Sequence, residues 1–410
     1  MSTIAPAFVG DAADILGRRT LYIITIGLYV ASNAALAKAR SFPALLGLRM
    51  LQSARTFSIA YGVIADIASP AGRGSYVSAL SFGITTAPSI GPVLGGALAF
   101  TAGWRWIFWF LCIASGCCFA MMVSTLPETA RNLVGNGSVA PPLGARLPFD
   151  RFMNHWNVPS HCDGRRFPNP LESLWILHYK DNLILIVGGS ILYMVYCCIH
   201  ASLATQFIDF YGLNQWQAGL IYLPFGAGCT LSTVFSGKLI DKGYKSIALL
   251  YGLPLDRTTR GGRELFPFEK ARLRCIWIPI TTATVSVSGF GWVLDKKTHI
   301  SIPLVFQFIA GVSIQTCFNI YNTLLVDINH RKPAAAQASN NLVRCTLAAL
   351  MVALLQPMID HIGVGWTFTI MGAMCLISTL LFVVEYCSGM AWRGERNLLA
   401  APERHQLESN

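Results

Sequence analysis

The chain has 410 residues, of which 53% are hydrophobic and only 12% are charged, and its formal net charge is +11. Soluble domains carry about 25% charged residues, so this composition excludes a soluble globular protein and indicates a protein with several membrane-spanning helices. The twelve cysteines show no CxxC or Cys/His spacing, and no P-loop, dinucleotide fingerprint or nucleophile–base pair occurs. We therefore expect no metal, no cofactor, no ATP-driven pumping and no enzymatic activity.

Apolar segments long enough to cross a bilayer recur along the whole chain, since about 20 apolar residues suffice for one crossing. A shorter apolar remnant, Met1–Val9, precedes the first of them. The ten predicted segments are Thr20–Ala37, Pro43–Asp66, Tyr76–Phe100, Arg105–Thr125, Leu183–Thr205, Trp216–Ser236, Cys275–Leu294, Ser301–Val326, Ala336–Met358 and Gly365–Tyr386.

Two polar stretches interrupt this pattern. Residues 127–182 contain Pro-rich and Gly-rich pieces with little periodicity and are predicted to be a linker, and Gly237–Arg274 is predicted to be a basic loop. The sequence thus predicts an incomplete N-terminal bundle (1–126), a central linker (127–182), a C-terminal bundle (183–388) and a tail (389–410).

The basic residues lie mainly on one side of the predicted membrane. Loops on that side carry 23 lysines and arginines, and the opposite loops carry 5. Because Lys and Arg accumulate in cytoplasmic loops, the linker and the C-terminus are expected in the cytoplasm. The positive charge therefore indicates membrane topology, and nucleic-acid binding is not expected.

The run Ser81–Gly96 combines small residues and prolines in a way that soluble helices rarely accept. Three of its small residues recur every four positions and share one helical face. This face predicts close helix–helix packing, either as a fixed seam or as the bent packing face of a transporter that rocks between two states. The residues concerned are Gly83, Ala87, Pro88, Gly91, Pro92, Gly95 and Gly96.

Two short Gly/Asp/basic sequences, Gly10–Arg19 and Gly237–Lys245, echo each other in the two halves of the chain. Parallel repeats of this kind are typical of two-bundle transporters. The residues that repeat, predicted to form cytoplasmic gating loops, are Gly10, Asp14, Gly17, Arg18 and Arg19, and Gly237, Asp241 and Gly243.

These motifs resemble the major facilitator superfamily. GDAADILGRR is similar to its signature between the second and third helices, and Ser81–Gly96 is similar to the fifth-helix signature of its antiporters. Other pieces resemble the quinidine-resistance-like branch of the fungal drug:proton antiporters, namely AGWRWIFWF, LPETARNLVGNGS, FPFEKARLR and ASNNLVRC. The resemblance implies twelve helices, so the chain is expected to lack the first helix and most of the second.

The resemblance also implies roles for individual residues. Asp14 would pair with basic residues and hold the outward-facing state shut, whereas Arg18 and Arg19 could instead be ordinary positive-inside anchors. Arg49 and Gln52 resemble an Arg-x-x-Gln motif associated with proton coupling, although Arg49 could also snorkel to the interface.

Further charged and amide residues inside apolar segments are candidates for a cavity. Arg55 departs from similar sequences, which have glycine there, and is either a cavity residue or a mark of a decayed sequence. Asn341 and Arg344 lie on one helical face and could line the cavity or cap the cytoplasmic end.

Aromatic and amide residues without carboxylates are predicted to line the substrate path. They suit flat, apolar or cationic substrates through stacking and cation–π contacts, although such tyrosines can also serve packing alone. The candidates are Tyr193, Tyr196, Gln307, Gln315 and Asn319.

The sequence therefore predicts an all-α, polytopic membrane protein of the major facilitator fold. The expected function is proton-coupled efflux of small organic molecules or drugs by alternating access. We expect it to act as a monomer in the plasma membrane, with a small organic substrate and protons as its partners. The alternative is a truncated remnant that inserts into the membrane but does not transport.

Overall fold

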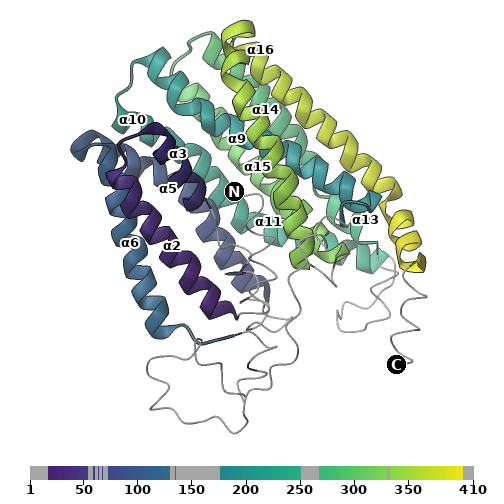
Figure 1. The fold of residues 1–410 in the computed structure, drawn as a ribbon. Coiled ribbons are helices and arrows are strands. Elements are labelled where there is room, and N and C mark those ends of the chain that lie inside the picture. Colours follow the sequence, from purple (N-terminus) through teal and green to yellow (C-terminus); the bar gives the residue numbers. More distant parts are fainter. Residues whose placement is uncertain are drawn as a thin grey trace. The chain divides into compact units, whose positions relative to one another are not determined.

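The computed structural model describes residues 17–53, 73–129, 176–250, 267–329 and 333–399, together with residues 59, 60, 63, 67 and 134. All the elements in these residues are α-helices (Figure 1). The chain divides into two compact units: residues 1–81 with 94–173, and residues 82–93 with 174–410. The long helix α5 contributes to both units, its middle part to the second.

In the first unit, α2 packs against both α3 and α6. Two glycines precede helices here with positive φ, Gly17 at 94° and Gly103 at 88°. Non-glycine residues rarely adopt this conformation, so the start points of α2 and α6 depend on glycine. The helices are α2 (Arg18–Lys38), α3 (Phe42–Gln52), α5 (Arg73–Ala102) and α6 (Trp104–Thr125).

The second unit holds the larger hydrophobic core, in which α9 packs on α16, α11 on α15, and α14 on both α15 and α16. Gly212 ends α9 in the left-handed conformation, with φ of 63°, and Asn214 with Gln217 forms a capping box at the start of α10. The helices are α9 (Lys180–Tyr211), α10 (Gln215–Leu220), α11 (Tyr222–Leu250), α13 (Phe268–Leu273), α14 (Trp277–Asp295), α15 (Ser301–Ile328) and α16 (Pro333–Leu399).

Seven helices in the described part of the chain are long and apolar enough to cross a membrane. The last of them, within α16, contains both of the final two predicted segments, and Gly363 with φ of 81° divides them.

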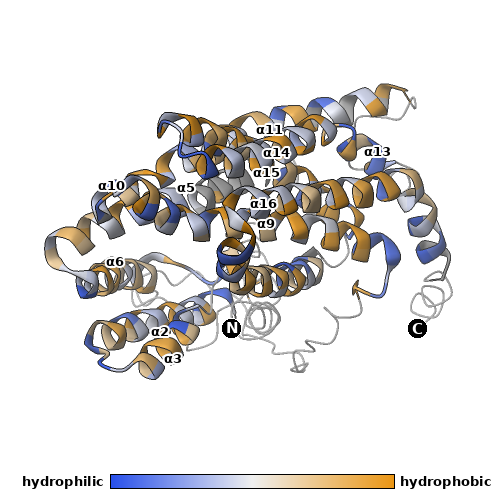
Figure 2. Cartoon of the chain, turned by 90° about the horizontal axis from the view of Figure 1, so that it is seen from above, coloured by the Kyte–Doolittle hydropathy of each residue, from blue (hydrophilic) through white to orange (hydrophobic). Residues whose placement is uncertain are grey.

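Large apolar side chains lie on the outside of these helices, as with Ile278 and Leu380, which are 80% and 64% exposed. Hydrophobic residues, in orange, make up much of the length of the helices (Figure 2). The fold is therefore that of a polytopic, all-helical membrane protein, as the sequence predicts.

The predicted loop beginning at Gly237 is wrong, because α11 continues as a helix to Leu250. Gly237, Asp241 and Gly243 are helical residues. A Cβ on Gly243 would lie 3.0 Å from the carbonyl oxygen of Ala271 in α13. This glycine thus has a packing role: it admits the backbone of α13 next to α11.

The packing seam predicted at Ala87, Gly91 and Gly95 is also absent from the described contacts. The helix α5 runs unbroken through Pro88 and Pro92. A Cβ on Gly91 or Gly95 would meet no atom within 4 Å. The close approach lies elsewhere on the helix, where Ser89 adjoins Gly226 of α11 and Pro92 adjoins Gly219 of α10, all within the second unit.

The closest backbone packing in the second unit joins α11 and α15. A Cβ on Gly228 would collide with the carbonyl oxygen of Phe308, and one on Gly311 with the carbonyl oxygen of Phe225. The Cys229 thiol also donates to the Gly311 carbonyl oxygen at 3.6 Å. These reciprocal contacts need glycine on both helices, and they fix α15, which carries much of the polar face described below.

We predict that Gly311→Ala destabilises the protein by about 1–3 kcal/mol, because the added methyl group overpacks a backbone contact. Gly91→Ala is the matched control, since it adds the same methyl group to a helical glycine with open space around it. Alanine is the better helix former by about 1 kcal/mol, so the control should be neutral or stabilising. Thermal unfolding in detergent measures both variants, and equal stability of the two would contradict the seam between α11 and α15.

Candidate functional site

An aromatic cluster lies on the half-buried face of α9. The rings of Tyr193 and Tyr196 stack with centroids 5.7 Å apart and an interplanar angle of 17°. Phe318 of α15 lies 6.0 Å from the first ring and 5.9 Å from the second. The Arg344 guanidinium of α16 lies over the Tyr193 ring, 4.6 Å from its centroid. Three helices thus bring two tyrosines, a phenylalanine and an arginine together.

Amide side chains continue from this cluster along α15. Gln315 donates to Asn319 at 3.1 Å, and Asn319 donates to the Ser236 hydroxyl of α11 at 2.6 Å. On the side toward α16, Asn340 donates to Asn322 at 3.2 Å. We call the tyrosine pair, Phe318, this amide row and Arg344 the polar face.

Two sequence-predicted residues have other surroundings. Gln307 is only 1% exposed, and neither of its amide atoms has a hydrogen-bond partner in the described part of the chain. Asn341 is half-buried beside Asn340 in α16. In the described part of the chain no hydrogen bond joins either residue to the polar face, so we assign them no part in it.

His200, one turn beyond Tyr196, is not among the lining residues predicted from the sequence. Its ring lies 4.5 Å from the Tyr196 ring and 4.7 Å from the Phe225 ring, measured between centroids. The i, i+4 spacing from Tyr196 was the available signal. His200 extends the aromatic cluster toward α11.

In the first unit, the Arg-x-x-Gln motif forms a local network. Arg49 donates to the side-chain amide oxygen of Gln52 at 3.1 Å, and the Gln52 amide nitrogen donates to the side-chain oxygen of Asn33 of α2 at 2.7 Å. The Arg49 guanidinium also lies 4.8 Å from the Phe108 ring centroid. Arg49 is therefore held by specific partners within the unit.

The start of α2 is tied to the end of α6. The buried Arg19 guanidinium donates to the carbonyl oxygens of Leu126 and Val123 at 3.0 and 2.7 Å. The backbone amides of Arg18 and Arg19 donate to the Glu128 carboxylate at 2.8 and 3.2 Å. Arg19 thus satisfies carbonyl groups at a helix C-terminus, which is a structural role.

Three residues predicted from the sequence, Gly10, Asp14 and Arg55, lie outside the described residues.

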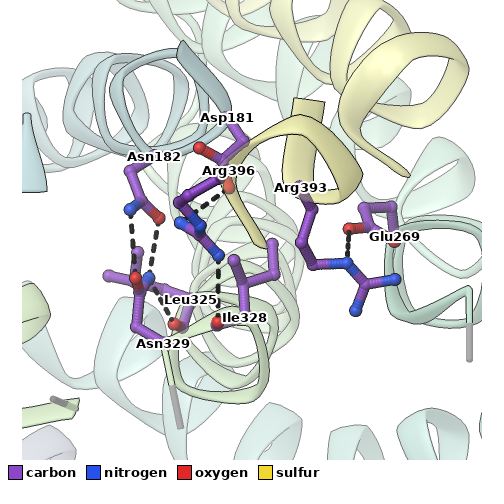
Figure 3. Close-up of polar contacts among 8 residues, drawn as sticks. All are labelled: Asp181, Asn182, Glu269, Leu325, Ile328, Asn329, Arg393 and Arg396. Atoms are coloured by element: carbon purple, nitrogen blue, oxygen red, sulfur yellow. Dashed lines mark hydrogen bonds and ion pairs between the residues drawn. The ribbon is translucent and has the colours of Figure 1, made fainter. Parts of the chain in front are cut away.

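A buried charge cluster, which sequence reasoning missed, lies where α9 begins and α16 ends (Figure 3). Arg396 pairs with Asp181 at 2.9 Å, and Arg393 pairs with Glu269 of α13 at 3.1 Å. Asn182 and Asn329 exchange amide hydrogen bonds of 3.0 and 2.6 Å beside them.

Arg393 and Arg396 belong to the stretch that the sequence predicts to be a tail, yet they are packed inside the second unit. Burial raises the pKa of the Glu269 carboxyl, and the Arg393 guanidinium partly offsets this rise.

Glu385 of α16 adds a third carboxyl group to the cluster. It is fully buried, and neither of its oxygens has a hydrogen-bond partner among the described residues. Its charged neighbours are Asp181, Glu269, Arg393 and Arg396. Among the described residues three carboxyl groups therefore face two guanidinium groups, and full ionisation would leave one negative charge without a described counter-charge. A buried, unpaired carboxylate is costly, and the arrangement favours one bound proton.

We predict that Arg396→Met destabilises the protein by about 3–5 kcal/mol, because it leaves the buried Asp181 carboxylate without its partner. Arg274→Met is the matched control: Arg274 is exposed, and such surface changes fall within about 0.5 kcal/mol. The double variant Asp181→Asn with Arg396→Met should recover part of the loss. Thermal unfolding in detergent checks this, and a double variant no more stable than Arg396→Met would argue against the pair.

Comparisons with known proteins agree with this architecture. The family model described as "Major Facilitator Superfamily" matches residues 1–353. The transporter phiD of Fungal sp. (strain ATCC 74256) is 32% identical over 96% of this chain, which spans 61% of phiD. The transporter phiL of the same fungus is 36% identical over 93% of this chain and 96% of its own length. Citrate exporter 1 of Aspergillus niger is 33% identical over 96% of this chain and 77% of its own length.

The fold also matches a solved structure, that of the human organic anion transporter MFSD10 (TETRAN). The TM-score is 0.53 and the identity 17%, covering 93% of this chain and 80% of that one. The relatives are transporters, a non-enzymatic class, and the chain is accordingly not an enzyme. The family match, the fungal relatives and the helical architecture lead to one conclusion: the chain belongs to the Major Facilitator Superfamily.

Proposed function

We propose that the chain is a secondary active transporter that exports small organic molecules by alternating access. The observation that carries this proposal is the polar face, since polar and charged groups inside membrane helices mark substrate pathways. Tyr193, Tyr196 and Arg344 come from α9 and α16 and offer stacking surface and charge in one place. The name of Citrate exporter 1 supports the direction of transport and a small organic substrate.

Proton coupling is part of the same proposal. The unpartnered Glu385 carboxyl, in a cluster with more carboxyl than guanidinium groups, supports a proton-binding group in the second unit. In the first unit, Arg49 and Gln52 retain the motif pair that the resemblance associates with proton coupling. We further propose that Asp14 acts with Arg18 as a cytoplasmic gate, while Arg19 anchors the start of α2 to the end of α6.

The proposed setting is the plasma membrane, with residues 127–182 and the C-terminus in the cytoplasm. The 23-to-5 bias in basic residues supports this orientation. We also propose that the chain belongs to the fungal drug:proton antiporter branch and acts as a monomer. The competing proposal is that the chain inserts into the membrane but does not transport.

We predict that inside-out vesicles from yeast expressing the chain accumulate a set of small organic molecules from a cell extract. Accumulation should require a pH gradient and disappear with a protonophore. Tyr193→Ala should reduce it at least about tenfold, because stacking contacts and the support of Arg344 are lost. Mass spectrometry of the vesicle contents measures this.

Phe110→Ala is the matched control for Tyr193→Ala, because Phe110 is an aromatic side chain of the first unit that is 43% exposed. It should accumulate the same compounds as the parent. If vesicles with the parent protein accumulate no more of any compound than vesicles without it, the chain is a non-transporting remnant.

We predict that Glu385→Gln separates transport from its driving force. The amide keeps the shape of the side chain but cannot exchange a proton. Exchange of substrate across the vesicle membrane should continue, whereas acceleration by a pH gradient should be lost. The matched control is Glu395→Gln, which makes the same change at an exposed carboxyl group of the same helix. An unchanged response of Glu385→Gln to the gradient would exclude this carboxyl from coupling.

A further inference from the structure

Arg344, which is half-buried, differs from three other arginines inside the second unit. Arg272, Arg393 and Arg396 each pair with a carboxylate, at 2.9, 3.1 and 2.9 Å. Arg344 has no ion pair with any described carboxylate, and its buried Nε atom has no hydrogen-bond partner there. A guanidinium in the membrane without a counter-charge is costly, so this group is suited to a partner that comes and goes.

The surroundings of Arg344 indicate the chemistry of that partner. The guanidinium lies over the Tyr193 ring, 4.6 Å from its centroid, so one of its faces is already engaged. The N–H groups of a guanidinium point outward along its edge, where a carboxylate can accept two parallel hydrogen bonds. The Tyr321 hydroxyl, an electrostatic neighbour of Arg344, is buried without a partner and offers a further donor.

The aromatic side chains supply an apolar surface beside this charge. Tyr196 stacks on Tyr193, and Phe318 lies within 6.0 Å of both rings. The two tyrosines alone would also suit a cation, as the sequence predicts. However, the Arg344 guanidinium already occupies the face of Tyr193, and a second cation there would meet a like charge.

We propose that Arg344 binds the carboxylate of an organic anion whose apolar or aromatic body lies against Tyr193, Tyr196 and Phe318. The transported class is thus organic anions, in place of cationic drugs. This inference rests on the proposed transport function, but it concerns binding, which can be measured without transport.

Three probes with the same ring system and different charge test the proposal on the purified full chain in detergent at pH 7. They are 2-naphthoate, an anion; 2-naphthamide, which is neutral; and 2-naphthylmethylamine, which is a cation at this pH. Isothermal titration calorimetry gives each dissociation constant. We expect 2-naphthoate to bind about 10- to 100-fold more tightly than 2-naphthamide, the range expected for hydrogen bonds to a charged group, and the amine to bind most weakly.

Two substitutions assign the preference to Arg344. Arg344→Gln should bind 2-naphthoate and 2-naphthamide equally, whereas Arg344→Lys should keep part of the preference, because lysine retains the charge but not the planar fork. Arg274→Gln, at an exposed position, is the matched control and should behave as the parent. Arg344→Gln should also unfold at the same or a higher temperature, because it removes an unpaired buried charge.

The proposal is overturned if the parent fails to prefer 2-naphthoate, or if Arg344→Gln keeps the preference. It is also overturned if Arg344→Gln lowers the unfolding temperature and leaves the preference intact, since Arg344 would then be a structural ion-pair partner.

Transport in vesicles is a separate readout. Arg344-dependent binding without accumulation would refute the proposed transport, and accumulation of neutral or cationic compounds that is insensitive to Arg344→Gln would refute only this inference.

Discussion

The second unit depends on one constraint: inside a membrane, a buried charge must find its partner within the protein, because lipid offers none. The charge cluster meets this constraint with residues from three helices. Asp181 begins α9, Glu269 lies in α13, and Arg393 with Arg396 lies near the end of α16. Removing one partner exposes the other to an apolar medium, so these helix ends are held together. Because α16 also carries Arg344, the cluster helps to fix the helix from which the polar face is built.

Close packing supplies the second support. The reciprocal glycine contacts between α11 and α15 let two backbones touch, and they set the rotation of α15. This rotation places Phe318 against the two tyrosines of α9 and turns Asn319 toward Ser236. Side chains larger than hydrogen at Gly228 or Gly311 would separate the helices. The polar face is therefore a consequence of backbone packing some turns away from it.

Hydropathy was sufficient to predict most helices, since the energetic cost of an unsatisfied backbone in lipid requires helical spans of known length. It failed at Gly237–Gly243, where glycine and charge were interpreted as a turn although both fit a helix that packs on α13. The seam at Gly91 failed because spacing predicts a small-residue face but not which neighbour covers it. The paired members of the charge cluster have no local signal, because they lie in segments that, taken singly, resemble a linker, a loop and a tail. Glu385 did have one, since it is an acidic residue inside the apolar segment Gly365–Tyr386.

The distribution of satisfied and unsatisfied charge separates two tasks. At the charge cluster, ion pairs hold helix ends in one arrangement, and Glu385 has no hydrogen-bond partner among the described residues. On the polar face, Arg344 lies over Tyr193 and has no ion-pair partner among the described residues. A ligand can shift a conformational equilibrium only by binding its two states differently. An anion on Arg344 therefore shifts the balance between two states only to the extent that the guanidinium and the aromatic rings lie together in one state and not in the other. Because these groups come from three separate helices, a movement of α16 against α9 or α15 would change the affinity for the anion.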